Sequence, residues 1–373
     1  MATWIERLDT YGSGLRVAVK DAIDVEGVRT TAGCPAVAAG AGPAASDAAC
    51  LVGFRAAGAR LVGKANLHEL CFGTSGINPW FGTPVNPLDA ALVPGGSSSG
   101  SAVAVATGEA DVALGTDTGG SVRIPAACCG VVGLKTTWGR IPLAGVWPLS
   151  AALDTVGPLA PDVAAAARGM ALLDPSFDAA GTAPASIVGR VRPYGVSVDP
   201  LVDAAVDRAL AAAEVEVVEL PLAGWHGAYE AFVSIITREA WEADRHLLDH
   251  RDGISPGVAE RIERGASIGD AEAAAARRVQ RTWQEELDAA FRRVEVLVLP
   301  TLSGPPPPLD DPLRIVLNAL TAPFNVSGTP ALSLPVPTGG RVPASLQIVG
   351  PRGREDLLCA TGSRIEGAVA GRI

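Results

Sequence analysis

Lysine is scarce in this chain. Among 373 residues, 30 are basic, yet only Lys20, Lys64 and Lys135 are lysines. A genome that favours Arg and Ala codons explains most of this bias. Arginine stays protonated inside proteins, whereas a buried lysine can lose its proton. A lysine that serves as a base therefore cannot be replaced by arginine, so each of the three is a candidate base.

Other scarce features exclude whole classes of protein. No apolar run approaches the roughly 18 residues that a membrane-spanning helix needs, and the start MATWIERLDT lacks the basic and apolar parts of a signal peptide. The four histidines form no metal-binding pattern. The net charge of −10, without a basic stripe, argues against nucleic acid. We expect a cytoplasmic protein that binds neither membranes nor nucleic acid and needs no metal or organic cofactor.

The cysteines point to the same compartment. None has the spacing of a metal site or of a small disulfide-rich domain. We expect free thiols in a reduced environment, where they pack as small apolar side chains. The six are Cys34, Cys50, Cys71, Cys128, Cys129 and Cys359.

Strand and helix patterns alternate along the chain, which favours an α/β fold built on a mixed sheet with helices on both faces. Apolar runs predict strands, including 15–19, 60–62, 112–115 and 130–134, and amphipathic patterns predict helices, including 47–57, 101–107, 158–170 and 313–325. No repeat or linker interrupts the pattern. We therefore expect a single domain over 1–373, with a catalytic core at about 15–160 and a helical, sheet-completing part at about 161–373.

Residues 94–127 form the most informative stretch, PGGSSSGSAVAVATGEADVALGTDTGGSVRIPAA. Its two Gly/Ser clusters, 95–101 and 119–121, flank a run of small residues and a short apolar run. Because glycine loses more backbone entropy on folding than any other residue, such density indicates a need for exposed N–H groups and positive φ. These are the parts of an oxyanion-binding loop. Serine hydroxyls among such donors point to acyl-transfer chemistry.

Two short motifs have alternative interpretations that we consider weaker. Residues 58–64 nearly match a phosphate-binding loop, but Ala65 replaces the Ser or Thr that would hold Mg²⁺. Residues 96–100 match the nucleophile elbow G-x-S-x-G around Ser98, yet no hydrophobic strand precedes them. The later histidines that a Ser98 triad needs lie on charged helical patterns; they are His226, His246 and His250.

Serine chemistry without histidine remains. A serine hydroxyl is a weak nucleophile and needs a base. Neutral lysine can act as that base when burial disfavours its charged form. Each lysine follows or ends an apolar run, so these arguments alone do not choose among the three.

The motifs resemble those of the amidase signature hydrolases. The central match is G-T-D-T-G-G-S-V-R-I-P at 115–125, preceded by G-G-S-S at 95–98 and by V-A-V-K-D at 17–21. Weaker matches lie at 63–69, 130–135, 154–158, 294–301, 324–335 and 346–350, so the resemblance spans most of the chain. The run GGSSSGSAVAVA with GTDTGGSVR is particularly similar to the compact indole-3-acetamide hydrolases of this family.

The resemblance implies a Ser-Ser-Lys triad. Ser121 would be the nucleophile, Ser97 a bridging serine after a cis peptide bond, and Lys20 the base. The backbone N–H groups of an oxyanion hole would come from Thr118, Gly119, Gly120 and Ser121. Supporting roles would fall to Ser98, Asp117 and Arg123, while Lys64 and Lys135 would be scaffold residues. The pocket walls are expected at 72–78, 146–151 and 317–325.

The implied reaction is hydrolysis of the C–N bond of a small-molecule amide through an acyl-enzyme, releasing ammonia or an amine and a carboxylic acid. A homodimer is possible within this family. One alternative is the amidase subunit of an amidotransferase or of a multi-subunit amide-degrading complex. Another is a binding scaffold without catalysis, against which the intact Lys20, Ser97 and Ser121 argue.

Overall fold

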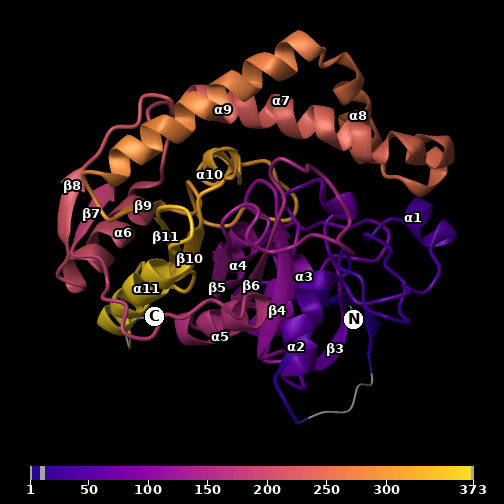
Figure 1. The fold of residues 1–373 in the computed structure, drawn as a ribbon, viewed down its shortest axis with the longest axis horizontal. Helices are drawn as coiled ribbons and strands as arrows, with labels where there is room; N and C mark the ends of the chain where they lie inside the picture. Colours follow the sequence, from indigo (N-terminus) through magenta and orange to yellow (C-terminus); the bar gives the residue numbers. More distant parts are fainter. Residues whose placement is uncertain (1, 9–12, 371–373) are drawn as a thin grey trace.

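Eleven strands in residues 2–8 and 13–370, the part that this computed structural model describes, join into one mixed sheet (Figure 1). The strands are β1 (Trp4–Arg7), β2 (Arg16–Lys20), β3 (Arg60–Ala65), β4 (Val112–Asp117), β5 (Val132–Lys135), β6 (Thr155–Ala160), β7 (Ile187–Arg190), β8 (Glu216–Glu219), β9 (Val296–Pro300), β10 (Ala331–Val336) and β11 (Ala344–Val349). Their order across the sheet is β1-β3-β2-β4-β6-β5-β10-β11-β9-β7-β8.

The α-helices are α1 (Pro35–Gly40), α2 (Val52–Ala56), α3 (Ser99–Ala106), α4 (Arg123–Cys129), α5 (Val163–Leu173), α6 (Pro200–Ala212), α7 (Trp225–Asp244), α8 (Pro256–Arg264), α9 (Asp270–Phe291), α10 (Ala322–Ser327) and α11 (Glu355–Val369). Short 3₁₀ turns lie at Ala49–Leu51, Glu69–Cys71, Arg245–Gly253 and Gly265–Ser267. The long helices α7 and α9 run side by side along one side of the molecule (Figure 1). Among the described helices, none combines the length and apolar character needed to cross a membrane.

Helices cover both faces of the sheet because successive side chains of a strand point to opposite faces. In β2, Val17 and Val19 pack in one cluster with α5, α6 and α11, whereas Ala18 packs in another with α3. In β9, Leu297 and Leu299 face a third cluster that holds residues of α7, α9 and α10. The α/β class expected from the sequence, a mixed sheet with helices on both faces, is confirmed.

The edge of the sheet where β2 and β4 end prepares the site. These two strands are parallel neighbours, so their carboxyl ends meet at the same edge. Lys20 ends β2 and Asp117 ends β4. In α/β sheets, functional groups gather beyond the carboxyl ends of parallel strands.

Three secondary-structure predictions need correction. The helix expected at 158–170 begins only at Val163, because Pro158 belongs to β6 and pairs with Leu114 of β4. The helix expected at 313–325 is confined to α10; the residues before it form turns, such as the bond from the Ala319 N–H to the carbonyl of Val316. The helix expected at 47–57 starts as the 3₁₀ turn at Ala49 and continues as the short α2.

Candidate active site

Lys20 lies buried among hydroxyl groups. Its Nζ donates to Ser97 Oγ at 2.7 Å and to Thr116 Oγ1 at 2.6 Å. The side chain is completely buried, and this burial lowers the pKa of Lys20 from its ordinary value, although Cys71 and the carboxylates of Asp154 and Asp117 act in the opposite direction. A lysine in such surroundings is able to exist as a neutral amine.

The other two lysines are buried as well, but they hold backbone. Lys64 donates to the carbonyl of Ile23 at 2.7 Å and pairs with Asp21 at 3.1 Å. Lys135 donates to the carbonyls of Thr136 and Thr329 at 3.0 and 2.8 Å. Burial also lowers the pKa of Lys135, to about 7. Depressed basicity is therefore shared with a scaffold lysine, and contact with a serine hydroxyl distinguishes Lys20.

The Gly/Ser loop before α3 joins Lys20 to the second Gly/Ser cluster. The peptide bond between Gly96 and Ser97 is cis, as the family resemblance implies. The Ser98 N–H donates to the carbonyl of Ser121 at 3.3 Å, and the Ser98 hydroxyl donates to the carbonyl of Thr116, also at 3.3 Å. Ser98 thus fastens the loop of Ser97 to that of Ser121.

Ser121 lines a small cavity. The residue is 5% exposed, and the cavity beside it has a volume of about 190 Å³. Within the described residues the Ser121 hydroxyl has no hydrogen-bond partner, so the expected relay from Ser121 to Ser97 is not closed in this structure. Catalytic hydrogen bonds often tighten only when substrate is bound.

The expected oxyanion hole needs one correction, at Gly120. Its N–H donates to Asp117 Oδ1 at 2.8 Å, while the carbonyl of the same peptide unit, on Gly119, accepts from Thr321 Oγ1 at 2.6 Å. The peptide is fixed from both sides, so the Gly120 N–H is turned away from the substrate. The N–H groups of Thr118, Gly119 and Ser121 have no acceptor in the described part of the chain, and all three residues line the cavity.

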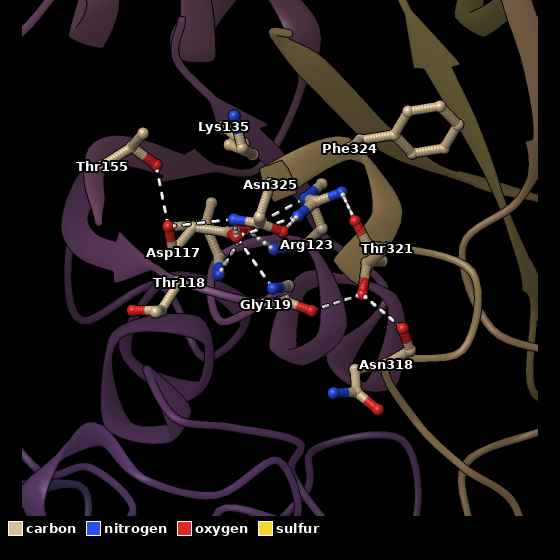
Figure 2. Close-up of polar contacts among 12 residues, drawn as sticks. Asp117, Thr118, Gly119, Arg123, Lys135, Thr155, Asn318, Thr321, Phe324 and Asn325 are labelled. Carbon is tan, nitrogen blue, oxygen red and sulfur yellow. Dashed lines mark hydrogen bonds and ion pairs between the residues drawn. The ribbon is translucent and has the colours of Figure 1, made fainter. Parts of the chain in front are cut away.

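Asp117 and Arg123 form the buried centre of the loop (Figure 2). Arg123 Nη2 lies 2.8 Å from Asp117 Oδ1 and donates to Asn325 Oδ1 at 2.6 Å; its Nη1 donates to Gln347 Oε1 at 2.7 Å. Burial alone would raise the pKa of Asp117, but the Arg123 guanidinium and the hydrogen bond from Asn325 hold it well below its usual range. A fully hydrogen-bonded buried pair of this kind fixes geometry.

Asp154 orients the other end of the loop. Its Oδ1 accepts from Thr118 Oγ1 at 2.6 Å, and its Oδ2 accepts from the N–H groups of Leu149 and Ser150, both at 2.9 Å. Burial raises the pKa of Asp154 to about 6 despite these bonds. Asp154 therefore ties Thr118 to the loop that carries Leu149, a wall of the cavity.

Each of the three predicted wall segments contributes to this cavity. Its lining consists of Cys71, Phe72, Gly73, Thr74, Thr118, Gly119, Ser121, Leu149, Phe232, Ile236, Arg261 and Asn318. Sequence reasoning missed Phe232, Ile236 and Arg261, because nothing distinguishes them locally from other residues of amphipathic helices. The roles of Asp154, Asn325 and Gln347 were also missed, although all three lie in segments that resemble the family.

Arg261 brings a positive charge to the cavity. Its guanidinium carbon lies 5.5 Å from the centroid of the Phe72 ring, and its Nε is buried without an acceptor in the described part of the chain. Burial lowers the pKa of Arg261. The neighbouring His68, whose Nε2 is 3.4 Å from Arg261 Nη2, has its pKa lowered to about 3 by burial and by this charge, and is therefore neutral.

The weaker motif interpretations receive no support from the geometry. Residues 60–65 of the near phosphate-loop pattern form the strand β3. Of the histidines considered for Ser98, His226 is 82% exposed and pairs with Glu230. Among the described residues, no group of three or more His, Cys, Asp or Glu side chains is arranged to hold a metal ion.

Comparisons with known proteins agree with these motifs. The Amidase family pattern matches residues 11–359. The glutamyl-tRNA(Gln) amidotransferase of Natronomonas pharaonis contains a polypeptide that is 35% identical over 404 residues, covering 94% of this chain and 95% of the relative. Its counterpart in the glutamyl-tRNA(Gln) amidotransferase of Halobacterium salinarum is 34% identical over 403 residues, with 95% of each chain covered.

Solved structures give the same result. A crystal structure of an amidase matches with a TM-score of 0.88 and 34% identity, over 95% of this chain and 85% of the other. A 6-aminohexanoate cyclic dimer hydrolase complexed with substrate matches with a TM-score of 0.85 and 26% identity, over 99% and 90%. The chain belongs to the amidase family and is a hydrolase of amide carbon–nitrogen bonds.

Proposed function

We propose that the protein hydrolyses small-molecule amides through an acyl-enzyme on Ser121. The observation that carries the proposal is the contact of 2.7 Å between Lys20 Nζ and Ser97 Oγ at the buried edge of the sheet. Lys20 makes no ion pair with a carboxylate in the described part of the chain, so no adjacent negative charge holds its proton. Neutral Lys20 is the base.

The first half of the reaction forms an ester. Ser121 Oγ bonds to the amide carbon while its proton passes to Ser97 and the proton of Ser97 passes to Lys20. The N–H groups of Thr118, Gly119 and Ser121 bind the oxygen that becomes negative. Fixed donors of this type stabilise the transition state because they need no reorganisation. Gly120 contributes its conformation instead: its φ is +130°, and a Cβ there would lie 2.3 Å from Thr321 Oγ1.

The second half regenerates the enzyme. The C–N bond breaks as the leaving nitrogen takes the proton held by Lys20 through Ser97, and ammonia or an amine departs. Water then attacks the ester carbon while Lys20 accepts its proton through the same serine. The C–O bond to Ser121 breaks, the carboxylic acid leaves and Ser121 recovers its hydroxyl.

A second candidate is the amidase subunit of an amidotransferase or of a multi-subunit complex, as the names of the relatives indicate. Glutamine presents both a carboxylate and an ammonium group. The cavity lining in the described residues contains Arg261 for the carboxylate but no Asp or Glu for the ammonium. We therefore place a free-standing amidase first. Co-purification of a partner at native expression levels would favour the second candidate.

Several coarser expectations belong with this proposal. We infer one catalytic domain over 1–373, because a single sheet runs through both halves of the chain. A cytoplasmic location fits the six buried free thiols. A third candidate, a non-catalytic binding scaffold, predicts that a serine-reactive phosphonate leaves Ser121 unlabelled.

The deciding experiment measures ammonia release from a panel of primary amides by the wild type and by Ser121→Ala. We expect release by the wild type alone, because loss of a nucleophile in such triads removes roughly 10⁴-fold or more of the rate. Equal release by both proteins contradicts the assignment of Ser121. Phosphonate labelling of the wild type, checked by mass spectrometry of the intact chain, separates an unsuitable panel from an inactive site.

A further inference from the structure

A second cavity lies beside the reaction cavity of Ser121. Its volume is about 860 Å³, and it opens between the start of α7 and three loops, 194–199, 303–306 and 314–319. Aromatic and apolar side chains dominate its lining, with Trp225 and Tyr229 from the helix and Pro305, Ile315 and Val316 from the loops. The reaction cavity, at about 190 Å³, is less than a quarter of this size.

One hydrogen bond separates the two cavities. Tyr229 lines the outer cavity and Asn318 lines the reaction cavity, and the Tyr229 hydroxyl donates to Asn318 Oδ1 at 3.1 Å. The Tyr229 ring lies 6.1 Å from the ring of Phe232, a second wall of the reaction cavity. A single half-buried bond between side chains contributes only about 1 kcal/mol net. This partition is therefore easily opened.

The sizes of the cavities limit what each can hold. Pockets that enclose a drug-sized ligand measure roughly 300–1,000 Å³. The reaction cavity is below that range, so it accommodates the amide group and a short chain, whereas the outer cavity is within it. A larger substrate must extend past Asn318, because this residue stands at the boundary with the larger space.

The charges near the outer cavity are either engaged or exposed. The Asp199 carboxylate accepts from the Leu201 N–H at 2.8 Å and caps α6. Arg314 lies on the exposed rim. A neutral apolar group suits such a lining better than an ionic one, since burial of an unpaired charge is costly. Aromatic side chains such as Trp225 and Tyr229 favour a ring.

We propose that the outer cavity is a substrate subsite for a neutral, ring-bearing part of the amide, and that the Tyr229–Asn318 pair opens to join it to the reaction cavity. The inference rests on the proposed amidase function and adds a substrate class to it. Tyr229 and Asn318 are then specificity-determining residues. The same segment reaches the oxyanion loop, because the Asn318 carbonyl accepts from the N–H of Thr321, whose hydroxyl holds Gly119.

The test compares two primary amides, propionamide and 4-phenylbutyramide, by the ratio of their kcat/KM values. Val316→Asp places a charge in the outer cavity at a residue that is 56% exposed, so folding is not at risk. We expect this variant to lower the ratio of 4-phenylbutyramide to propionamide about tenfold, through KM. Tyr229→Phe, which keeps the ring but removes the hydrogen bond, should raise the ratio about threefold. The matched control is Val233→Trp, on the exposed side of α7 and outside both cavities.

Three results separate the possible failures. If the wild type hydrolyses propionamide and Val316→Asp leaves the ratio unchanged, the subsite is wrong while the amidase function stands. If the wild type hydrolyses no amide, the proposed function fails, and calorimetric titration of Ser121→Ala with 4-phenylbutyramide decides the subsite. Binding there that Val316→Asp weakens about tenfold supports it, and binding that is absent or insensitive to Val316→Asp overturns it. Repeating the ratio with N-(3-phenylpropyl)acetamide shows whether the ring lies on the acyl or the amine side.

Discussion

The catalytic loops and the helical wall of the cavity are held by different kinds of contact. In the catalytic loops, residues 95–99 and 116–123, polar groups are fixed from both sides: the peptide between Gly119 and Gly120 is fixed by Asp117 and Thr321. In the helical wall, α7, α8 and residues 313–321, Phe232 packs in an apolar cluster. Tyr229 and Asn318 are joined there by one bond.

This difference separates chemistry from substrate choice. Groups that move protons or bind an oxyanion must be held to a fraction of an ångström, and hydrogen bonds at both ends achieve this. A wall built from apolar contacts can accommodate a change of side chain without disturbing the reacting atoms. We therefore expect changes in the loops to remove activity and changes in the wall to redirect it.

The largest effect is expected at Lys20. Both Lys20→Arg and Lys20→Met should lose roughly 10⁴-fold in kcat/KM, because arginine restores the charge but cannot act as a base. Steady-state kinetics on a hydrolysed primary amide measures the loss, and circular dichroism checks the fold. A fully active Lys20→Arg variant would contradict the role of Lys20 as base.

The pH dependence of activity tests the same lysine in the unmodified enzyme. Burial lowers the pKa of Lys20, and only the neutral amine accepts a proton. Activity should therefore be full above the pKa and fall about tenfold per pH unit below it, with a midpoint well under the ordinary value of about 10.4. The residual activity of Lys20→Met provides the control, since it should lack this slope. A wild-type kcat/KM that stays constant from about pH 6 to 9 would count against the assignment.

Asp154 offers a stability effect where the loop meets the wall. Its pKa is raised from 3.8 to about 6 by burial, so the folded state binds the proton more tightly than the unfolded state. Stability is therefore lost as the pH rises from about 4 to 6, by about 3 kcal/mol. Asp154→Asn cannot ionise and should be spared this loss.

Urea unfolding at pH 4 and pH 7.5 measures this effect. The difference in unfolding free energy between Asp154→Asn and the wild type should shift by about 3 kcal/mol in favour of the variant at the higher pH. Asp288→Asn, an exposed position on α9, serves as the matched control. A difference that is the same at both pH values would show that Asp154 does not titrate in this way.

The sequence predicts the catalytic loops far better than the wall, for physical reasons. Lys20, Ser97 and Ser121 lie in short contiguous motifs whose residue types follow from the chemistry. The orientation of the Gly120 N–H could not be predicted, because a peptide unit faces either way depending on distant partners such as Thr321. Arg261 lies far along the chain from Ser121 and has no local pattern. Asn318 was expected on a helix, but the turns of residues 313–321 follow from contacts that the sequence does not display.

The smallest effect is expected at Thr321, where a residue of the wall fixes a catalytic loop. Thr321→Val removes the hydroxyl that donates to Gly119 at 2.6 Å and leaves the peptide held by Asp117 alone. Loss of one oxyanion donor typically costs about 10²–10³ in rate, and loosening a peptide that supports such donors should cost less, about tenfold in kcat with little change in KM. Thr321→Ser keeps the hydroxyl and should retain most of the activity. If Thr321→Val and Thr321→Ser are equally active, the bond to Asp117 suffices, and the wall influences catalysis only through the substrate that it admits.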